Sequence, residues 1–537
     1  MYAKKIIVSA KSRLTLKYGK QFSKINKLLQ TLKAADKKRG IATRIVFIDD
    51  AVSAKQAGIK PVKNVNAREC KRAVDDLYKK HLPDYIVLAG SQDIFPFQEI
   101  NNPADEDGDL TVPSDLPYAC DAPYSKSVQS FTGPTRVVGR IPDVPGENDI
   151  QYFTTVINNI INAKPRKEEL YMQYFGVSAY VWRISTELSL QNMVGNHTNL
   201  LLSPGSKSKY TAAQLKKLTH FYNCHGAQND MAFYGQKGSN YPIAVSSTQL
   251  NGKISAGTIV AAECCYGAEL VNPVLLPQPG VLSIANNYLK NNAIAFMGSS
   301  NIAYGPADSQ GLADLITQYF IKNIIAGAST GRALLQARQQ FLSATGPHLD
   351  PYELKTIAQF HLLGDPSILP VIDDSIKKVV SKNTVQNTRM KLFNKGSDLK
   401  KNLAPSHKEK TAAPSAHQKD INILLKETGF SAYDKKGVFK ATIKASPQRI
   451  SEKKLAPRTA RFRTFVKAIS TPGSVSFDNI KVLVIKESQE QLLGWRIYEK
   501  KKKKYRQDKG GTAFRESCNK KNSQRFQIGT RRCIAAD

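Results

Sequence analysis

The chain has 537 residues and a formal net charge of +34, and its hydrophobic fraction of 41% is enough for ordinary buried cores. This length predicts more than one domain. No run of about 18 apolar residues occurs, which excludes a transmembrane helix on sequence grounds, and the seven cysteines are too scattered for a disulfide scaffold.

The first part of the chain alternates strand and helix patterns. Buried-strand patterns occur at residues 4–10, 43–51, 84–97 and 134–143, and amphipathic helix patterns at residues 22–40, 67–82 and 147–164. Strands that alternate with helices predict a mostly parallel sheet covered on both faces. We therefore expect an α/β subdomain over residues 1–160.

The same alternation then begins again. Strand patterns occur at residues 171–180, at the end of 215–227, and at 257–265, 293–300 and 359–370. Helix patterns occur at residues 281–292, 311–327 and 330–344. This repetition predicts a second α/β/α subdomain of similar construction over residues 165–375.

Beyond this point the composition changes. Residues 376–420 are polar and basic, as in a linker, whereas alternating apolar residues predict a small β-rich module over residues 421–498. Residues 499–537 lack periodicity and predict a basic, disordered tail. From Ile376 to the end there are 39 Lys and Arg against 13 Asp and Glu, a balance of +26, whereas the first 375 residues balance at +8 (39 against 31).

Besides a tail that is cleaved off during activation, for which it offers many Lys and Arg sites, this basic C-terminal part has two interpretations. The first is a solvated, flexible extension. The second is electrostatic attachment to a polyanion, which would be nucleic acid or an anionic surface. The N-terminal residues lack the long apolar segment of a secretory signal, and the chain contains no Cys-x-x-Cys pair. We therefore expect a cytoplasmic protein with reduced thiols.

Two predicted strand ends carry the residues with chemical potential. One contains His225 followed by Gly226, and the other contains Cys264 and Cys265 followed by Gly267. In doubly wound sheets, functional groups gather where parallel strands end. A cysteine nucleophile needs a nearby base such as histidine, because the thiolate is the attacking species.

These segments resemble the gingipain-type, caspase-fold cysteine peptidases. The resemblance rests on NCHGAQND with AAECCYGAEL, and on the ordered segments DYIVLAGSQDIFPF, VVGRIPD, AIAFMGSSNIAYGP, TGRALLQARQQF and HLLGDPSILP. It covers roughly residues 1–370 and implies two caspase-like α/β subdomains, with a Cys–His dyad on the second. It further implies a cysteine endopeptidase that acts on protein or peptide substrates without a metal or other cofactor.

The two adjacent cysteines leave the nucleophile to be decided. Neighbouring residues on a strand point to opposite faces, so only one of them can face His225. The gingipain-like spacing of Cys-x-x-Gly favours Cys264, whereas the caspase-like spacing, with one residue between Cys and Gly, favours Cys265. The other matching segments favour the gingipain type, and so the pattern selects Cys264.

The resemblance also implies the remaining site residues. The backbone N–H groups of Gly226 and Cys264 would hold the oxyanion, and Asp115 is the candidate acid that orients His225. Asp121 and Asp308 are alternatives for that role, or else they form an acidic pocket for a Lys or Arg side chain of the substrate.

Tyr304 is expected to form one wall of that substrate pocket. The competing hypothesis for the whole chain is a catalytically silent caspase-like scaffold whose basic tail binds a polyanion.

Overall fold

The computed structural model describes residues 3–104, 107–205, 210–346, 349–372, 418–427, 429–431, 435–443, 458–469, 479–487 and 492–501. These residues form two compact units, one with the described residues up to Ile372 and one with those from Gln418 onward. The predicted linker, residues 376–420, lies outside the described residues except for its last three. The predicted tail, residues 499–537, lies outside them beyond Lys501.

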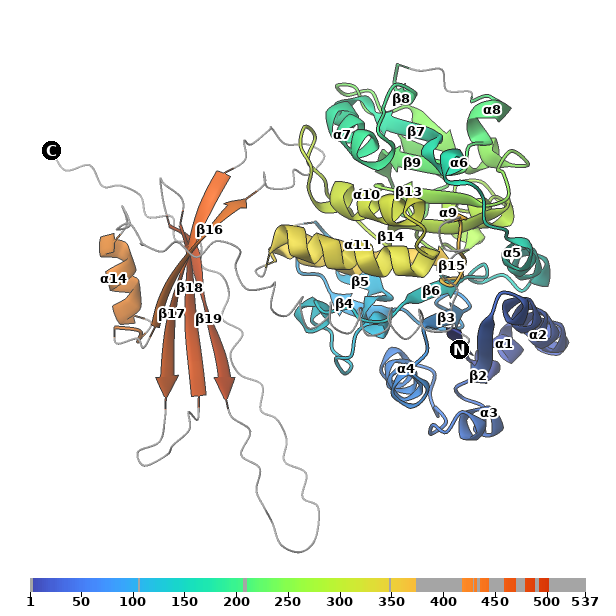
Figure 1. Ribbon diagram of the computed structural model, residues 1–537, viewed down its shortest axis with the longest axis horizontal. Coiled ribbons are helices and arrows are strands. Elements are labelled where there is room, and N and C mark those ends of the chain that lie inside the picture. Colours follow the sequence, from blue (N-terminus) through green and yellow to red (C-terminus); the bar gives the residue numbers. More distant parts are fainter. Residues whose placement is uncertain are drawn as a thin grey trace, which may run out of the picture. The chain divides into compact units, whose positions relative to one another are not determined.

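The larger unit is built on one ten-stranded sheet (Figure 1). Its strands, in chain order, are β1 (Ala3–Ser9), β2 (Ile41–Phe47), β3 (Tyr85–Ala89), β6 (Val138–Ile141), β7 (Tyr174–Ala179), β8 (Leu200–Ser203), β9 (Thr219–Asn223), β13 (Thr258–Ala262), β14 (Ala293–Ser299) and β15 (Phe360–Gly364). In space the order is β2-β1-β3-β6-β15-β14-β13-β9-β7-β8. β15 runs antiparallel to β14, whereas the other neighbouring strands pair in parallel.

The two predicted halves of this unit share the sheet. Strand β15 comes from the end of the second half and pairs with β6 of the first half, with Leu363 opposite Arg140. The fully buried Lys5 Nζ on β1 lies 2.5 Å from a carboxylate oxygen of Asp36 and 2.6 Å from one of Asp365. These contacts join the first strand of the unit to its last turn. Breaking them would leave an uncompensated buried charge, which is strongly unfavourable.

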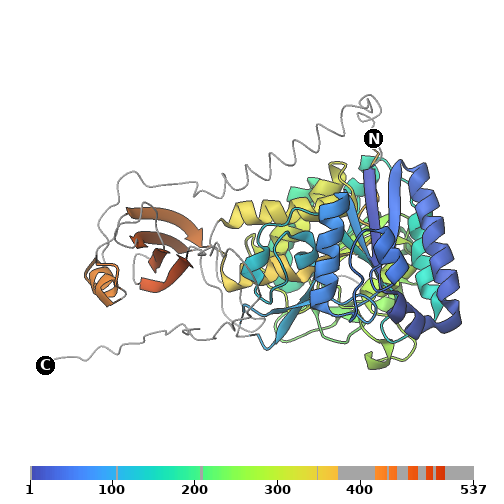
Figure 2. The ribbon, with the colours of Figure 1, turned by 90° about the horizontal axis from the view of Figure 1, so that it is seen from below.

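Helices cover both faces of the sheet (Figures 1 and 2). The helices are α1 (Lys11–Tyr18), α2 (Phe22–Lys38), α3 (Ala51–Gln56), α4 (Ala67–His81), α5 (Ile150–Asn162), α6 (Glu168–Met172), α7 (Arg183–Val194), α8 (Ala212–Leu215), α9 (Ile284–Lys290), α10 (Leu312–Ile325), α11 (Thr330–Thr345) and α12 (Pro351–Gln359). Helices α2, α5 and α9 pack in one layer, and α7, α10 and α11 pack in another. The predicted α/β/α architecture is confirmed.

Local sequence explains these elements. In α2 the residues Ile25, Leu29 and Leu32 are fully buried, because their spacing of three and four places them on one side of the helix. Asn66 caps the start of helix α4: its side-chain oxygen accepts a hydrogen bond from the backbone N–H of Glu69. Such a cap satisfies a donor at the helix start that would otherwise have no partner.

Two small sheets lie beside the large one. The first contains β10 (His225–Gly226), β11 (Ala232–Tyr234) and β12 (Ile243–Ser246), and the second contains β4 (Gln98–Asn101) and β5 (Thr111–Ser114). The first continues directly from β9, and it therefore turns the chain at the point where the sequence places its histidine.

The C-terminal unit is the predicted small β-rich module. It contains α14 (Gln418–Glu427) and the antiparallel strands β16 (Lys435–Ile443), β17 (Arg458–Ile469), β18 (Asn479–Glu487) and β19 (Leu492–Lys501), paired in that order. Its core includes Ile421, Phe430, Phe465, Leu483 and Ile485. Across the described ranges of the chain, no helix is long and apolar enough to span a bilayer.

Candidate active site

The structure brings the two predicted strand ends to the same edge of the sheet. Strands β9 and β13 are parallel neighbours with Tyr222 opposite Ala262, and Glu263 N–H donates to the Tyr222 carbonyl oxygen at 2.8 Å. A side chain at Gly226 would place its Cβ 1.9 Å from the carbonyl oxygen of Cys265. The His-Gly segment therefore packs directly against the cysteine pair, and only glycine fits there.

Cys264 belongs to the hydrophobic core. Its side chain is fully buried, and its thiol accepts a hydrogen bond from the backbone of Cys224. Burial raises the pKa of the Cys264 thiol well above its usual value, and the neighbouring Cys224 adds to this effect. Such surroundings disfavour the thiolate.

Cys265 lies on the other side of the chain. It is 7% exposed and lines a small pocket together with Trp182 and Tyr304. Its Sγ accepts a hydrogen bond from Ala303 N–H at 3.4 Å. Burial raises the pKa of this thiol as well, and the hydrogen bond from Ala303 opposes the rise.

The two cysteines thus face opposite ways in the turn that follows β13. The side chain of Cys264, the residue that the Cys-x-x-Gly spacing selects, lies in the core, whereas that of Cys265 lines the pocket. The choice of the nucleophile between the two stays a prediction.

His225 is held by aromatic rings and one amide. Its Nε2 lies 2.8 Å from Gln236 Oε1, and its ring packs on Trp182 at 4.4 Å and on Tyr241 at 5.3 Å between centroids. Burial lowers the pKa of His225, and the Gln236 contact opposes the shift. The imidazole is therefore neutral near pH 7 and able to accept a proton.

The pocket beside Cys265 has an acidic wall. Its volume is about 30 Å³, and its lining is formed by Trp182, Asn223, Cys224, Glu263, Cys265, Ala303, Tyr304, Gly305, Pro306 and Ala313. Glu263 hydrogen-bonds with Asp314, and burial raises the pKa of Glu263 to about 7 and that of Asp314 well above its usual value. Asp314 Oδ1 is buried without a hydrogen-bond partner within the described residues. The two carboxyl groups of Glu263 and Asp314 therefore retain a proton near neutral pH, and a bound cation could displace it.

Asp115, the candidate orienting acid, has another partner. Both of its carboxylate oxygens accept hydrogen bonds from Arg140, at 2.6 and 2.9 Å. This ion pair is buried on both sides. Asp115 thus forms a structural ion pair. The side chain that hydrogen-bonds to the His225 ring is Gln236 instead.

The two acids proposed for the substrate pocket also lie elsewhere. Asp121 forms an ion pair with Arg136, and its side chain is 70% exposed. Asp308 is exposed on the segment that precedes α10 and does not line the pocket. Tyr304 lines the pocket beside Cys265. The acidic wall of the pocket beside Cys265 therefore comes from Glu263, a residue that the sequence pattern did not indicate.

A buried cation fixes the other side of the cysteine turn. Lys355 Nζ contacts Asp107 and lies 2.5 Å from Asp109 Oδ2. Tyr304 donates its hydroxyl to Asp107, and Tyr266 donates its hydroxyl to Asp109, each at 2.8 Å. Tyr266 has φ = +54°, a conformation that is strained for a non-glycine residue. The Lys355 cluster thus holds a strained residue next to Cys265.

Sequence patterns offered only part of this site. Glu263 could have been considered from the sequence, because it directly precedes the cysteine pair. No sequence pattern marks Trp182, Gln236 or Lys355 as site residues, because they reach the site only when distant segments pack together.

These features define a class of protein: a cysteine-dependent hydrolase on a mostly parallel α/β sheet, with imidazole and thiol at neighbouring strand ends. Residues 6–371 match the model of peptidase family C25. The chain belongs to this family, which is that of the gingipains, and it is a cysteine peptidase. No curated protein matches the chain.

Proposed function

We propose that the protein is an endopeptidase that uses Cys265 and His225 as its dyad and cleaves after Lys or Arg. The observation that carries the proposal is the shared pocket: Cys265 and Glu263 both line it, and Trp182 connects it to the His225 ring at 4.4 Å. Family membership supports a cysteine peptidase, and the contacts of the described residues support this choice of atoms.

The chemistry follows from two neutral groups. The pKa of the Cys265 thiol is raised and that of His225 is lowered, so the resting pair is a thiol beside an imidazole. As Cys265 Sγ attacks the scissile carbonyl carbon, His225 takes the thiol proton. The C–N bond then breaks, the leaving amine receives that proton, and water hydrolyses the thioester to release the acid and the free thiol.

The oxyanion is assigned to the backbone N–H groups of Gly226 and Cys265. The close packing of these residues supports this choice, since a Gly226 Cβ would lie 3.5 Å from Cys265 N. Donors fixed in this way stabilise charge that develops in the transition state. The second donor is therefore Cys265 and not Cys264, because the proposed nucleophile also moves by one residue.

The preference for a basic residue rests on Glu263 and Asp314. A Lys or Arg side chain in the pocket would supply the positive charge that this buried acidic pair lacks. A volume of about 30 Å³ is narrow for such a side chain, so the proposal requires Tyr304 and Pro306 to move apart when substrate binds. Such closure and opening of loops is common in enzymes.

The test compares two single substitutions in the full chain. Cys265→Ala is expected to lower kcat on fluorogenic Lys- and Arg-ended peptides by at least about a thousandfold, because the covalent intermediate cannot form. Cys264→Ala is the matched control, since it also removes one buried thiol, and it should retain kcat within about threefold. Full activity of Cys265→Ala together with loss of activity in Cys264→Ala would refute the dyad and assign the nucleophile to Cys264, whereas an unaltered chain without peptidase activity would favour a silent scaffold.

A further inference from the structure

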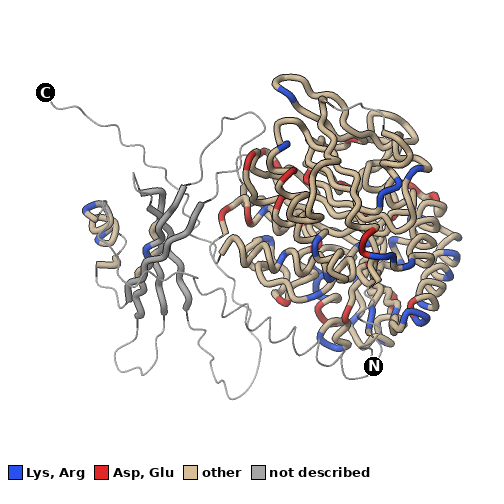
Figure 3. Tube along the Cα trace, turned by 45° about the horizontal axis from the view of Figure 1, so that its top comes forward, with Lys and Arg blue, Asp and Glu red and all other residues tan. Residues whose placement is uncertain are grey.

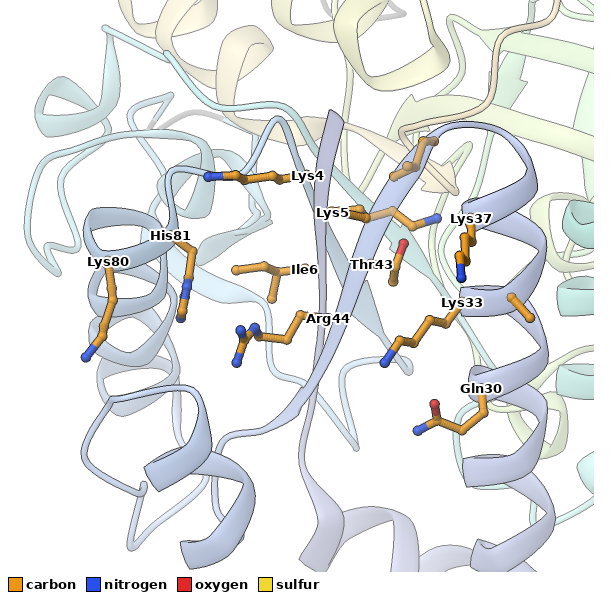
Figure 4. A pocket seen from close by; sticks show the side chains of 13 residues that line it. Lys4, Lys5, Ile6, Gln30, Lys33, Lys37, Thr43, Arg44, Lys80 and His81 are labelled. Carbon is orange, nitrogen blue, oxygen red and sulfur yellow. The ribbon is translucent and has the colours of Figure 1, made fainter. Parts of the chain in front are cut away.

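A basic groove lies at the β2 edge of the sheet. Its volume is about 760 Å³, and it is lined by residues of β1, β2, α2 and α4 (Figure 4). Strand β2 ends the spatial order of the large sheet, and among the described residues only β1 pairs with it. An edge strand of this kind presents backbone N–H and C=O groups that another strand can bind.

The lining of the groove carries unbalanced positive charge. Among the residues that the structure describes, no Asp or Glu lines it. Lys5 is neutralised by Asp36 and Asp365, but the other Lys and Arg residues of the lining form no ion pair within the described part of the chain: Lys4, Lys33, Lys37, Arg44 and Lys80. Figure 3 shows basic positions recurring along α2 at this side of the unit.

These cations lie on both sides of β2. In Figure 4, Lys33 and Lys37 of α2 stand on one side of the strand, and Arg44 and Lys80 stand on the other. Arg44 Nη1 donates to the Gln56 carbonyl at 3.1 Å, and Lys80 Nζ donates to the Gly58 carbonyl at 3.3 Å. These hydrogen bonds hold the two cations beside the strand without neutralising them.

We propose that this groove binds an acidic peptide segment in extended form, which adds a strand to the free edge of β2. Successive side chains of a strand point to opposite faces, so consecutive Asp or Glu residues would send carboxylates alternately to the α2 side and to the α4 side. The backbone of the peptide would pair with β2, as in other cases of strand addition.

The arrangement favours a peptide over a nucleic acid. A phosphate backbone would use the cations but would leave the edge N–H and C=O groups of β2 without a partner. The C-terminal part of the chain is itself basic, which argues that the acidic segment belongs to another molecule.

The test is fluorescence anisotropy with the full chain at about 50 mM salt, where charge interactions are weakly screened. The probe is a labelled peptide with a run of about six Glu, a length that spans a typical strand. Lys33→Glu with Lys37→Glu, and separately Arg44→Glu with Lys80→Glu, should each weaken its binding roughly tenfold. Lys24→Glu with Lys38→Glu is the matched control on α2, outside the groove lining, and should change binding by less than about twofold.

A second probe tests strand pairing. The same peptide with alternate backbone nitrogens methylated keeps its charge but loses hydrogen-bond donors, and it should bind at least about tenfold more weakly. Equal binding of the methylated peptide would overturn the proposal, as would equally tight binding of an oligothymidylate that the same substitutions weaken. Absence of binding of the first probe to the unaltered chain would also overturn it. Peptidase activity should be the same in all variants, which separates this proposal from that of the dyad.

Discussion

At the scale of single residues, the adjacent cysteines divide two tasks. Cys264 fills the core and Cys265 lines the pocket, both in the turn that follows β13. Glu263, the residue before Cys264, lines the same pocket as Cys265. Three consecutive residues therefore supply an acidic pocket wall, a packing group and a thiol.

The role proposed for Glu263 predicts a substrate preference that depends on pH. Since burial raises its pKa to about 7, the carboxylate that attracts a cation forms as the pH rises from about 6 to 8. We expect KM for a peptide with Lys before the scissile bond to fall over this range, relative to a norleucine peptide. Titration of His225 affects both substrates equally, so its effect cancels in the ratio of KM for the Lys peptide to KM for the norleucine peptide.

The Glu263→Gln variant is the control for this dependence. It should raise KM for the Lys peptide by at least about tenfold and abolish the pH dependence of the ratio, because an amide does not ionise. An unchanged KM profile would remove Glu263 from the substrate pocket.

The same substitution has a predicted effect on stability. A carboxyl whose pKa is raised from 4.5 to about 7 by folding destabilises the folded state once the pH exceeds the unfolded value, and the cost is complete above about pH 7. Glu263→Gln should therefore raise Tm at about pH 8 and leave it nearly unchanged at about pH 4.5. Thermal unfolding at the two pH values measures this difference.

At the scale of elements, the turn from β9 into β10 determines the site. Gly226 lies where a Cβ would meet the Cys265 carbonyl oxygen at 1.9 Å. Gly226→Ala must therefore push β10 away from the cysteine turn, and we expect kcat to fall by at least about a hundredfold through loss of alignment. Gly133→Ala is the control, since its Cβ would meet nothing within 4 Å. Near-normal kcat in Gly226→Ala would show that the turn tolerates a wider separation.

How much the sequence could predict differs between elements. Repeated strand and helix patterns predicted the layered architecture, and the pairing of the His-Gly segment with the cysteine segment followed from both lying at strand ends. The position of β15 between β6 and β14 could not be predicted, since it depends on pairing between residues more than 200 positions apart, such as Arg140 and Leu363. The same reason hid the Lys355 cluster, whose partners Asp107 and Asp109 precede it by 248 and 246 positions.

At the scale of the whole molecule, chemistry and charge belong to different parts of the chain. The residues of the candidate site, from Asp107 to Lys355, lie within the first compact unit, which contains the matched residues 6–371. The buried Lys5 with Asp36 and Asp365 closes this unit from its first strand to its last turn. It therefore contains all residues of the proposed dyad and pocket.

This separation predicts the effect of removing the C-terminal part. A chain of residues 1–375 should cleave short Lys-ended peptides with kcat/KM within about twofold of the full chain, because no candidate site residue is lost. Its retention on heparin should fall sharply, since the deleted residues carry a charge balance of +26 of the total of +34. Salt elution of the two chains from one column measures this difference. Equal retention would assign polyanion binding to the first unit, including the groove at β2, whereas a large loss of kcat/KM would mean that the C-terminal part contributes to the active conformation.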